Sequence, residues 1–191
     1  MKTPPLLGLY SIKANSTTVR AVAAHLQSHH NFELIEFSET SKIMAVNLLQ
    51  KVGYDSTSAL QLVGSNRHKM LQHFNIDGKS LVEEIDSLIQ SHLLSNYALI
   101  AMGIEVSSRA FDDSKRGIVV SDVRTFSQAK FIQENGGYVI RVDEVASNGA
   151  NDYLKDFNFD KYILNDSGLI GLNRNTDLTL ESISEVVLEA V

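Results

Sequence analysis

Hydrophobic positions along the chain alternate between short apolar runs and longer stretches with helical spacing. The first pair is an apolar run over residues 6–12 and a segment over residues 17–30, where apolar residues recur every three or four positions. Such a run is typical of a buried strand, and such a periodicity is typical of a helix packed on one face. Strands alternating with helices predict a parallel sheet covered by helices, that is, an α/β fold.

The same two patterns continue through the rest of the chain. Further strands are expected over residues 32–37, 118–121, 138–142 and 162–164. Further helices are expected over residues 41–52, 67–74, 126–134 and 179–190. One more helix should begin at a capping box formed by Ser80 and Glu83. Residues 54–66 and 97–103 are ambiguous, while residues 105–117 and 143–158 are expected to be loops.

Composition and charge narrow the class of protein. The 191 residues are 43% hydrophobic and 21% charged, which fits a folded domain with a substantial core. A net charge of −6 argues against binding to duplex nucleic acid. Because there are no cysteines, disulfides, thiolate zinc sites and cysteine nucleophiles are excluded. With no apolar stretch near ~20 residues and no signal-peptide pattern, we expect a cytoplasmic protein without a membrane partner.

The loop between the first strand and the first helix is the first candidate for chemistry. Residues 8–18 read GLYSIKANSTT. A phosphate-binding P-loop reads G-x-x-x-x-G-K-[ST] and also lies between a strand and a helix. With Ser16 and Thr17 in the hydroxyl positions, Asn15 stands in the lysine position and Ala14 in the glycine position before it. The alternative is an ordinary turn with a hydroxyl cap on the helix.

A second candidate lies just beyond the strand at residues 118–121. Asp122 and Arg124 follow that strand closely, and open α/β sheets bind ligands at the carboxyl ends of their strands. Arg124 could bind a phosphate or carboxylate through two hydrogen bonds, with Asp122 orienting a ligand group or the arginine. The alternative is an ion pair that fixes the strand end to the next helix.

Several motifs follow one another in a fixed order. The second half contains Asp-x-Arg, Gly-Gly with a Val-Ile-x-Val strand, and Asn-Asp-x-Gly, formed by Asp122, Arg124, residues 136–142, Asn165, Asp166 and Gly168. After the first strand, loop and helix, the first half contains Phe37, Lys42, Leu48-Leu49, Arg67 and Leu71-Gln72. In this order they resemble the phage deoxynucleoside monophosphate kinases and, more distantly, phosphomevalonate kinase.

The resemblance implies a P-loop kinase-like three-layer α/β/α fold with a parallel sheet core. It implies one domain over residues 1–191, with a helical substrate-side insertion at about 38–115 and a lid-like loop at about 143–158. A phage origin would place the protein in the host cytoplasm.

The resemblance also implies transfer of the γ-phosphoryl group of ATP to a deoxynucleoside monophosphate, with Mg²⁺ as cofactor. The loop residues implied to bind ATP are Lys13, Ala14, Asn15, Ser16 and Thr17, and Ser16 would also hold Mg²⁺. The candidate catalytic residues are Asp122, Arg124 and Arg67, the last as a phosphate clamp.

The departures from this family lie on the ATP side of the site. Asn15 is neutral and cannot offset the charge of a transition state, and Ala14 adds a Cβ where phosphate must come close. Asp143 and Glu144 follow the strand at 138–142 and would repel phosphate. Lys13 or Arg20 could replace the missing lysine; the alternatives are a solvated loop lysine and a surface helix residue. The chain is therefore expected to be either a kinase with altered catalysis or an inactive pseudokinase that binds a nucleotide or a protein, with a homodimer among the alternatives.

Three histidines lie near the end of the first expected helix. His25 and His29 are spaced i, i+4, and His30 follows directly. Such a group fits either a metal site or cations that interact favourably with the helix C-terminus. The second interpretation is favoured.

Overall fold

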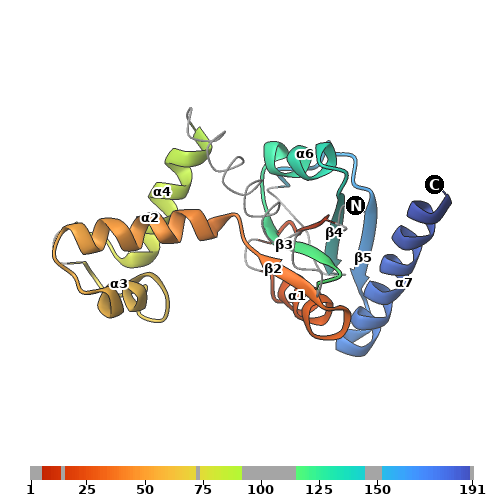
Figure 1. Cartoon of the computed structure of the whole chain (residues 1–191), viewed down its shortest axis with the longest axis horizontal. Coiled ribbons are helices and arrows are strands. Elements are labelled where there is room, and N and C mark those ends of the chain that lie inside the picture. Colours follow the sequence, from red (N-terminus) through yellow and green to blue (C-terminus); the bar gives the residue numbers. More distant parts are fainter. Residues whose placement is uncertain (1–5, 14–15, 72–73, 92–114, 145–151, 190–191) are drawn as a thin grey trace. The chain divides into compact units, whose positions relative to one another are not determined.

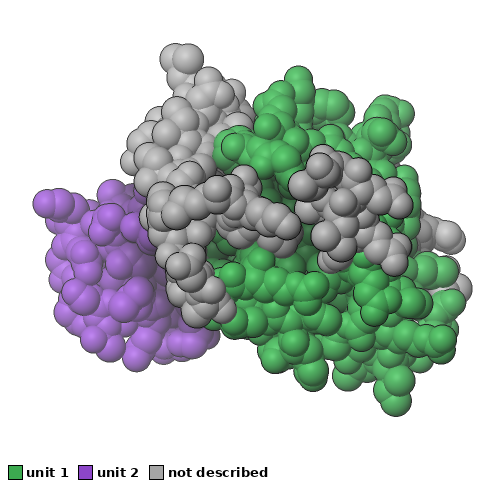
Figure 2. All heavy atoms as spheres, turned by 45° about the vertical axis from the view of Figure 1, so that its right-hand side comes forward, with its two compact units in different colours: residues 1–36, 106–191 green, residues 37–105 purple. Residues whose placement is uncertain are grey.

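A computed structural model of the chain describes residues 6–13, 16–71, 74–91, 115–144 and 152–189. The chain divides into two compact units (Figure 2). The first unit consists of Met1–Glu36 and Val106–Val191, and the second unit is Phe37–Glu105. The second unit overlaps the segment expected as an insertion at 38–115; its substrate-side role stays a prediction. None of the described helices is both long and apolar enough to span a membrane.

The first unit is built on a five-stranded sheet in which every pair of neighbours is parallel (Figure 1). The strand order is β2-β3-β1-β4-β5. The strands are β1 (Leu6–Tyr10), β2 (Phe32–Ile35), β3 (Gly117–Val123), β4 (Tyr138–Glu144) and β5 (Lys161–Asn165). The predicted parallel sheet is confirmed. Because all strands run the same way, their carboxyl ends meet along one edge, which we call the C-terminal edge.

Helices cover both faces of this sheet (Figure 1). Alternation along the central strand explains how: Leu7 and Leu9 point to one face, and Gly8 points to the other. On the first face, α1 (Thr17–His30) and α7 (Gly168–Glu189) enclose a core with the sheet. On the second face, α6 (Phe126–Glu134) packs over Gly8 through Ile132. The predicted three-layer α/β/α arrangement is confirmed.

Two glycines allow α6 and β4 to come close to β1. The space beside Gly8 is filled by the side chains of Ile132 and Val123. At Gly137, an added Cβ would lie 2.6 Å from the carbonyl oxygen of Leu6 and 2.9 Å from that of Ile132. Its neighbour Gly136 has a φ of 73°, which L side chains rarely adopt. The predicted Gly-Gly turn therefore fixes the approach of β4 to the sheet.

The second unit contains α2 (Ser38–Lys51), α3 (Ser56–Val63) and α4 (Gly78–Ser91). Helix α3 lies within residues 54–66, where the sequence pattern was ambiguous. The core of the second unit consists of Ala45, Leu49, Ala59, Val63, Leu71 and Leu81. These residues come from all three helices and from the segment between α3 and α4, so the unit has a core of its own.

The helix predicted over residues 67–74 is wrong. Residues 64–68 form turns, Met70 pairs with Asp77 in an antiparallel bridge, and the backbone N–H of Leu71 donates to the carbonyl of Ile76 at 2.8 Å. The apolar residues here have helical spacing, but Asn75 adopts a left-handed φ of 53° and closes a tight turn instead.

The capping box predicted at Ser80 and Glu83 is also wrong. The Asp77 carboxylate accepts the backbone N–H of Ser80 at 2.7 Å, so α4 begins at Gly78. Asp77 competes successfully because a carboxylate is as good an N-cap as a hydroxyl.

The last helix is much longer than expected. A helix was predicted over residues 179–190, but α7 begins at Gly168. Its first turns carry exposed apolar residues, Leu169 and Ile170, and the buried position Thr176 is polar. The Thr176 hydroxyl donates to the carbonyl of Leu172 at 2.9 Å, which satisfies it inside the helix. This mixture hid the helical periodicity.

Candidate functional site

The predicted P-loop segment leads into a helix that starts where the sequence predicts. Ser16 is the N-cap of α1: its hydroxyl oxygen accepts the backbone N–H of Val19 at 3.4 Å, and the residue is buried. Residues 17–20 contain no acidic side chain, so α1 brings no negative charge of its own to its N-terminus. The positive end of the helix dipole and its first N–H groups therefore favour an anion from elsewhere.

Glu144 provides this anion. It is the last residue of β4, and alternation along that strand puts it on the same face as Ile140 and Val142, the face covered by α1. One carboxylate oxygen pairs with the Lys13 ammonium at 2.7 Å. The other accepts the Thr18 hydroxyl at 2.5 Å.

These contacts set the charge state of Glu144. The hydrogen bond from Lys13, followed by the one from Thr18, lowers the pKa of Glu144 below its ordinary value. Ser16 adds a longer contact, with its hydroxyl 3.5 Å from the same carboxylate oxygen that Thr18 reaches. Glu144 is therefore a carboxylate at neutral pH, bound at the start of α1.

Asn165 extends the site to the next strand. It ends β5 and lies opposite Glu144 in the β4–β5 register. Its amide donates to the Thr18 hydroxyl oxygen at 3.4 Å. Thr18 thus accepts from one strand end and donates to the next, so α1 is tied to the C-terminal edge of the sheet.

Only some of the loop residues predicted to bind ATP take part in the contacts around Glu144. Lys13 and Ser16 belong to the site, whereas Thr17 is exposed on the first turn of α1. Ala14 and Asn15 lie outside the described residues. Thr18, which the sequence interpretation did not select, is the buried hydroxyl that contacts Glu144. The P-loop alignment favoured Thr17, but the position one residue later on the helix faces the sheet.

Asp122 and Arg124 lie at the C-terminal edge, as predicted from their position after a buried strand. Strand β3 runs beside β1 with an irregular register: Gly8 is opposite Val120, but Tyr10 is opposite Val123. The extra residue in β3 forms a bulge next to Asp122, a feature common beside functional sites. The backbone N–H of Arg124 donates to the Gln128 side chain at 2.8 Å. The catalytic roles of Asp122 and Arg124 stay predictions.

Arg67 lies in the second unit. Its side chain is exposed, and its backbone carbonyl accepts the N–H of Lys79 at 2.8 Å. Its role as a phosphate clamp stays a prediction.

A second polar network lies on the opposite face of β4. Arg141 donates to Asp143 at 2.8 Å and to Asp152 at 2.8 Å, and the Tyr10 hydroxyl donates to Asp152 at 2.6 Å. Burial, together with the bond to Asp152, raises the pKa of Tyr10 far above its ordinary value. Burial alone would raise the pKa of Asp152, but the bond from Tyr10 and the charge of Arg141 lower it. These contacts join the ends of β1 and β4 to the segment that contains Asp152.

The loop expected over residues 143–158 begins after residue 144, and the described residues 152–158 lie outside helices and strands, as predicted. Strand β4 extends through Glu144, and residues 152–157 pack their buried Leu154 and Phe157 side chains. The Tyr10 ring stacks on Phe159, with centroids 5.3 Å apart. Residues 145–151 lie outside the described part of the chain, and a lid role for this segment stays a prediction.

Comparison with known proteins identifies the fold. No protein-family model and no curated protein matches the chain. Among solved structures, dephospho-CoA kinase from Campylobacter jejuni is similar over 94% of this chain and 97% of that chain, with a TM-score of 0.50. The sequence identity is 12%, so the likeness concerns the fold alone. The chain has a P-loop kinase-like fold, as predicted.

Proposed function

We propose that this chain is a nucleotide-binding protein of the P-loop kinase-like class in which phosphoryl transfer has been reduced or lost. One observation carries the proposal: the carboxylate of Glu144 lies at the start of α1, bound by Lys13 and Thr18. A P-loop binds phosphate at the equivalent place. The site therefore retains groups that bind anions but already contains a negative charge of its own.

The donors around Glu144 are suited to phosphate. An ammonium, a hydroxyl and the helix N-terminus all bind phosphate oxygens in proteins. Lys13 and Thr18 currently share one carboxylate. A phosphate could bind to these donors once the Glu144 side chain turns aside. The Lys13 side chain is half exposed, so its ammonium can move with the phosphate.

Charge explains why transfer should be weak. Phosphoryl transfer relies on positive groups that neutralise the charge on the transferred phosphoryl group. Lys13 is the nearby cation, and Glu144 cancels its charge at 2.7 Å. Asn15, in the lysine position of the sequence, brings none.

Of the two cofactors that the fold implies, Mg²⁺ fits the residues at the start of α1 better than ATP does. Ser16, Thr18 and Glu144 offer hydroxyl and carboxylate oxygens, which are the ligands that Mg²⁺ prefers. Bound there, Mg²⁺ would neutralise phosphate charge. The terminal phosphate of ATP fits less well, because Glu144 would repel it.

The second candidate is an active deoxynucleoside monophosphate kinase, as the resemblance implies. The position of Asp122 and Arg124 favours it, since Asp122 is the second-last residue of β3 and Arg124 directly follows this strand, which pairs with β1. An arginine there is suited to the phosphate of a monophosphate acceptor. The interaction module suggested by the sequence, including a homodimer, would need no nucleotide at all.

The test combines an activity assay with a binding assay on the full chain. It is incubated with ATP, Mg²⁺ and each deoxynucleoside monophosphate, and nucleoside diphosphate is measured; the same nucleotides are titrated by calorimetry. We expect binding without product above the background lacking protein. Product at ordinary kinase rates, about 1–100 s⁻¹, would establish the second candidate instead. No heat with any nucleotide would leave only the interaction module.

A further inference from the structure

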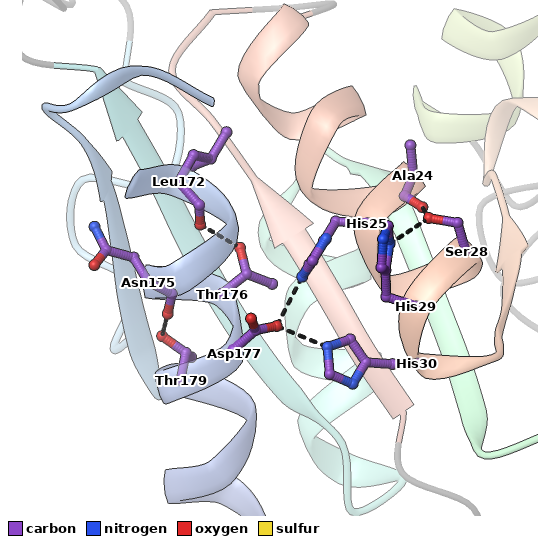
Figure 3. Close-up of polar contacts among 10 residues, drawn as sticks. All are labelled: Ala24, His25, Ser28, His29, His30, Leu172, Asn175, Thr176, Asp177 and Thr179. Carbon is purple, nitrogen blue, oxygen red and sulfur yellow. Dashed lines mark hydrogen bonds and ion pairs between the residues drawn. The ribbon is translucent and has the colours of Figure 1, made fainter. Parts of the chain in front are cut away.

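Two histidines and an aspartate, residue types that commonly ligate metal ions, meet where the end of α1 packs against α7 (Figure 3). The Nε2 atoms of His25 and His30 each lie 2.7 Å from the same oxygen of Asp177. Figure 3 shows the carboxylate of Asp177 reaching across from α7 to the two imidazoles of α1. The ligand atoms of the three residues all lie within 4.8 Å of one another.

The grouping differs from the one that the sequence indicated. Spacing i, i+4 pointed to His25 and His29, but the His29 ring stacks on that of His25, with centroids 4.6 Å apart. The Nδ1 atom of His29 lies 2.8 Å from the Ser28 hydroxyl. His30 takes its place, and Asp177, which is 147 residues further along the chain, completes the group.

We propose that His25, His30 and Asp177 bind a divalent transition-metal ion, with Zn²⁺ as the preferred ion. Two imidazoles and a carboxylate form a common zinc ligand set, in which water takes the fourth position. The group is placed for this: His25 is buried, His30 is one-fifth exposed, and Asp177 faces solvent enough to admit an ion.

The change needed on binding is small. Ligands of a tetrahedral zinc ion at about 2.0–2.1 Å lie about 3.3 Å apart. Each 2.7 Å hydrogen bond must therefore open by about 0.6 Å as the metal replaces the Nε2 protons. Rotation of the half-exposed Asp177 side chain is sufficient for this.

The surroundings of His25 limit the affinity. Among the described residues, its Nδ1 atom is buried and has no hydrogen-bond partner. Histidines in tight zinc sites usually donate this second N–H to an acceptor. We therefore expect an affinity below that of closed structural zinc sites.

The proposed metal site is separate from the group of Lys13, Thr18 and Glu144 at the start of α1. His25 follows Thr18 by seven residues, which is about 10 Å along a helix, and His30 lies about 18 Å away. The ion would join α1 to α7 without touching a ligand of the P-loop. Because it binds the folded chain, it should raise the melting temperature of the protein.

The test uses the full chain without a histidine tag, freed of metal by a chelator. Zn²⁺ alone is titrated by calorimetry, and Co²⁺ alone is followed by its visible absorption, which reports tetrahedral coordination. We expect one equivalent to bind and the melting temperature to rise with Zn²⁺. Asp177→Asn and His30→Gln should bind at least about 10-fold more weakly.

The control variant is His29→Gln, which removes an adjacent histidine that is not a ligand. It should bind Zn²⁺ like the wild type. His25→Ala is not informative because His25 is buried, and circular dichroism must show that the other variants are folded. If the wild type fails to bind one equivalent saturably, or if His29→Gln loses affinity as much as Asp177→Asn, the proposal is wrong.

Discussion

Replacing Glu144 with glutamine removes one negative charge from the start of α1 and leaves the size of the side chain almost unchanged. In the wild type, the carboxylate occupies the Lys13 ammonium and the Thr18 hydroxyl. An incoming phosphate must displace it or lie beside it. The variant should therefore bind phosphate and nucleotides more tightly than the wild type.

The size of the effect follows from Coulomb's law. A phosphate bound by the same donors would lie about 4–5 Å from the carboxylate, where two unit charges repel by about 1–4 kcal/mol at an effective dielectric constant between 80 and 20. Lys13 is 49% exposed, so water screens the site and the lower part of this range applies. About 1–2 kcal/mol corresponds to an affinity about 5–30-fold higher.

The assay is calorimetric titration of both proteins with ATP and with inorganic phosphate in EDTA, so that Mg²⁺ does not contribute. The matched control is Glu134→Gln, which removes the same charge from the exposed face of α6, where Glu134 pairs with Lys130 at 3.5 Å. Glu134→Gln should leave both affinities unchanged. If Glu144→Gln binds no better than the wild type, or if the control improves binding equally, Glu144 does not compete with phosphate.

Three further predictions concern stability, measured by urea unfolding. Asp152→Asn should lower the free energy of unfolding by about 2 kcal/mol, because it removes the charge of a mostly buried partner of Arg141 and Tyr10. An unchanged free energy of unfolding would contradict a stabilising role for these contacts. Gly137→Ala should lower the free energy of unfolding by more than about 2 kcal/mol, because the new Cβ would clash with two backbone carbonyls. Gly136→Ala should lower it by only about 1 kcal/mol, because its positive φ is strained for alanine but the space beside it is open. The reverse order would be evidence against this packing. The pKa of Glu144 is below its ordinary 4.5, so its stabilisation is complete above pH 4.5 and disappears as the pH falls through the lower folded value; the difference between wild type and Glu144→Gln should shrink in acid, not grow.

Local patterns were sufficient for the elements that frame the site. Helix α1 was predicted with its observed ends because both its signals are local: a serine N-cap and an apolar stripe. Helix α6 was predicted with its observed ends from its own periodicity. Helix α7 was not, because a polar Thr176 at a buried position interrupts the apolar pattern.

The contact between Glu144 and Thr18 shows what local patterns could not provide. The two residues are 126 positions apart, and their meeting depends on β4 lying directly beside β1 in one register. From the sequence, Glu144 was expected only to repel the phosphate groups of a bound ligand. The sequence did not indicate that the same residue would bind the loop itself. Continued alternation after Val142 was the available signal, since it places Glu144 on the face of α1.

The carboxylate of Glu144 has a structural explanation that does not depend on any ligand. A P-loop with bound nucleotide has phosphate charge at its helix N-terminus, and an acidic first turn can serve the same purpose. Helix α1 has no acidic residue in its first turn, yet its N-terminus carries a buried serine and a buried threonine that need partners. Glu144 satisfies both hydroxyls and the helix dipole from inside the chain. A chain that stabilises the start of this helix through its own carboxylate does not depend on a bound phosphate to do so, and under the function proposed above this explains how the fold can persist with Asn15 and Ala14 in the loop.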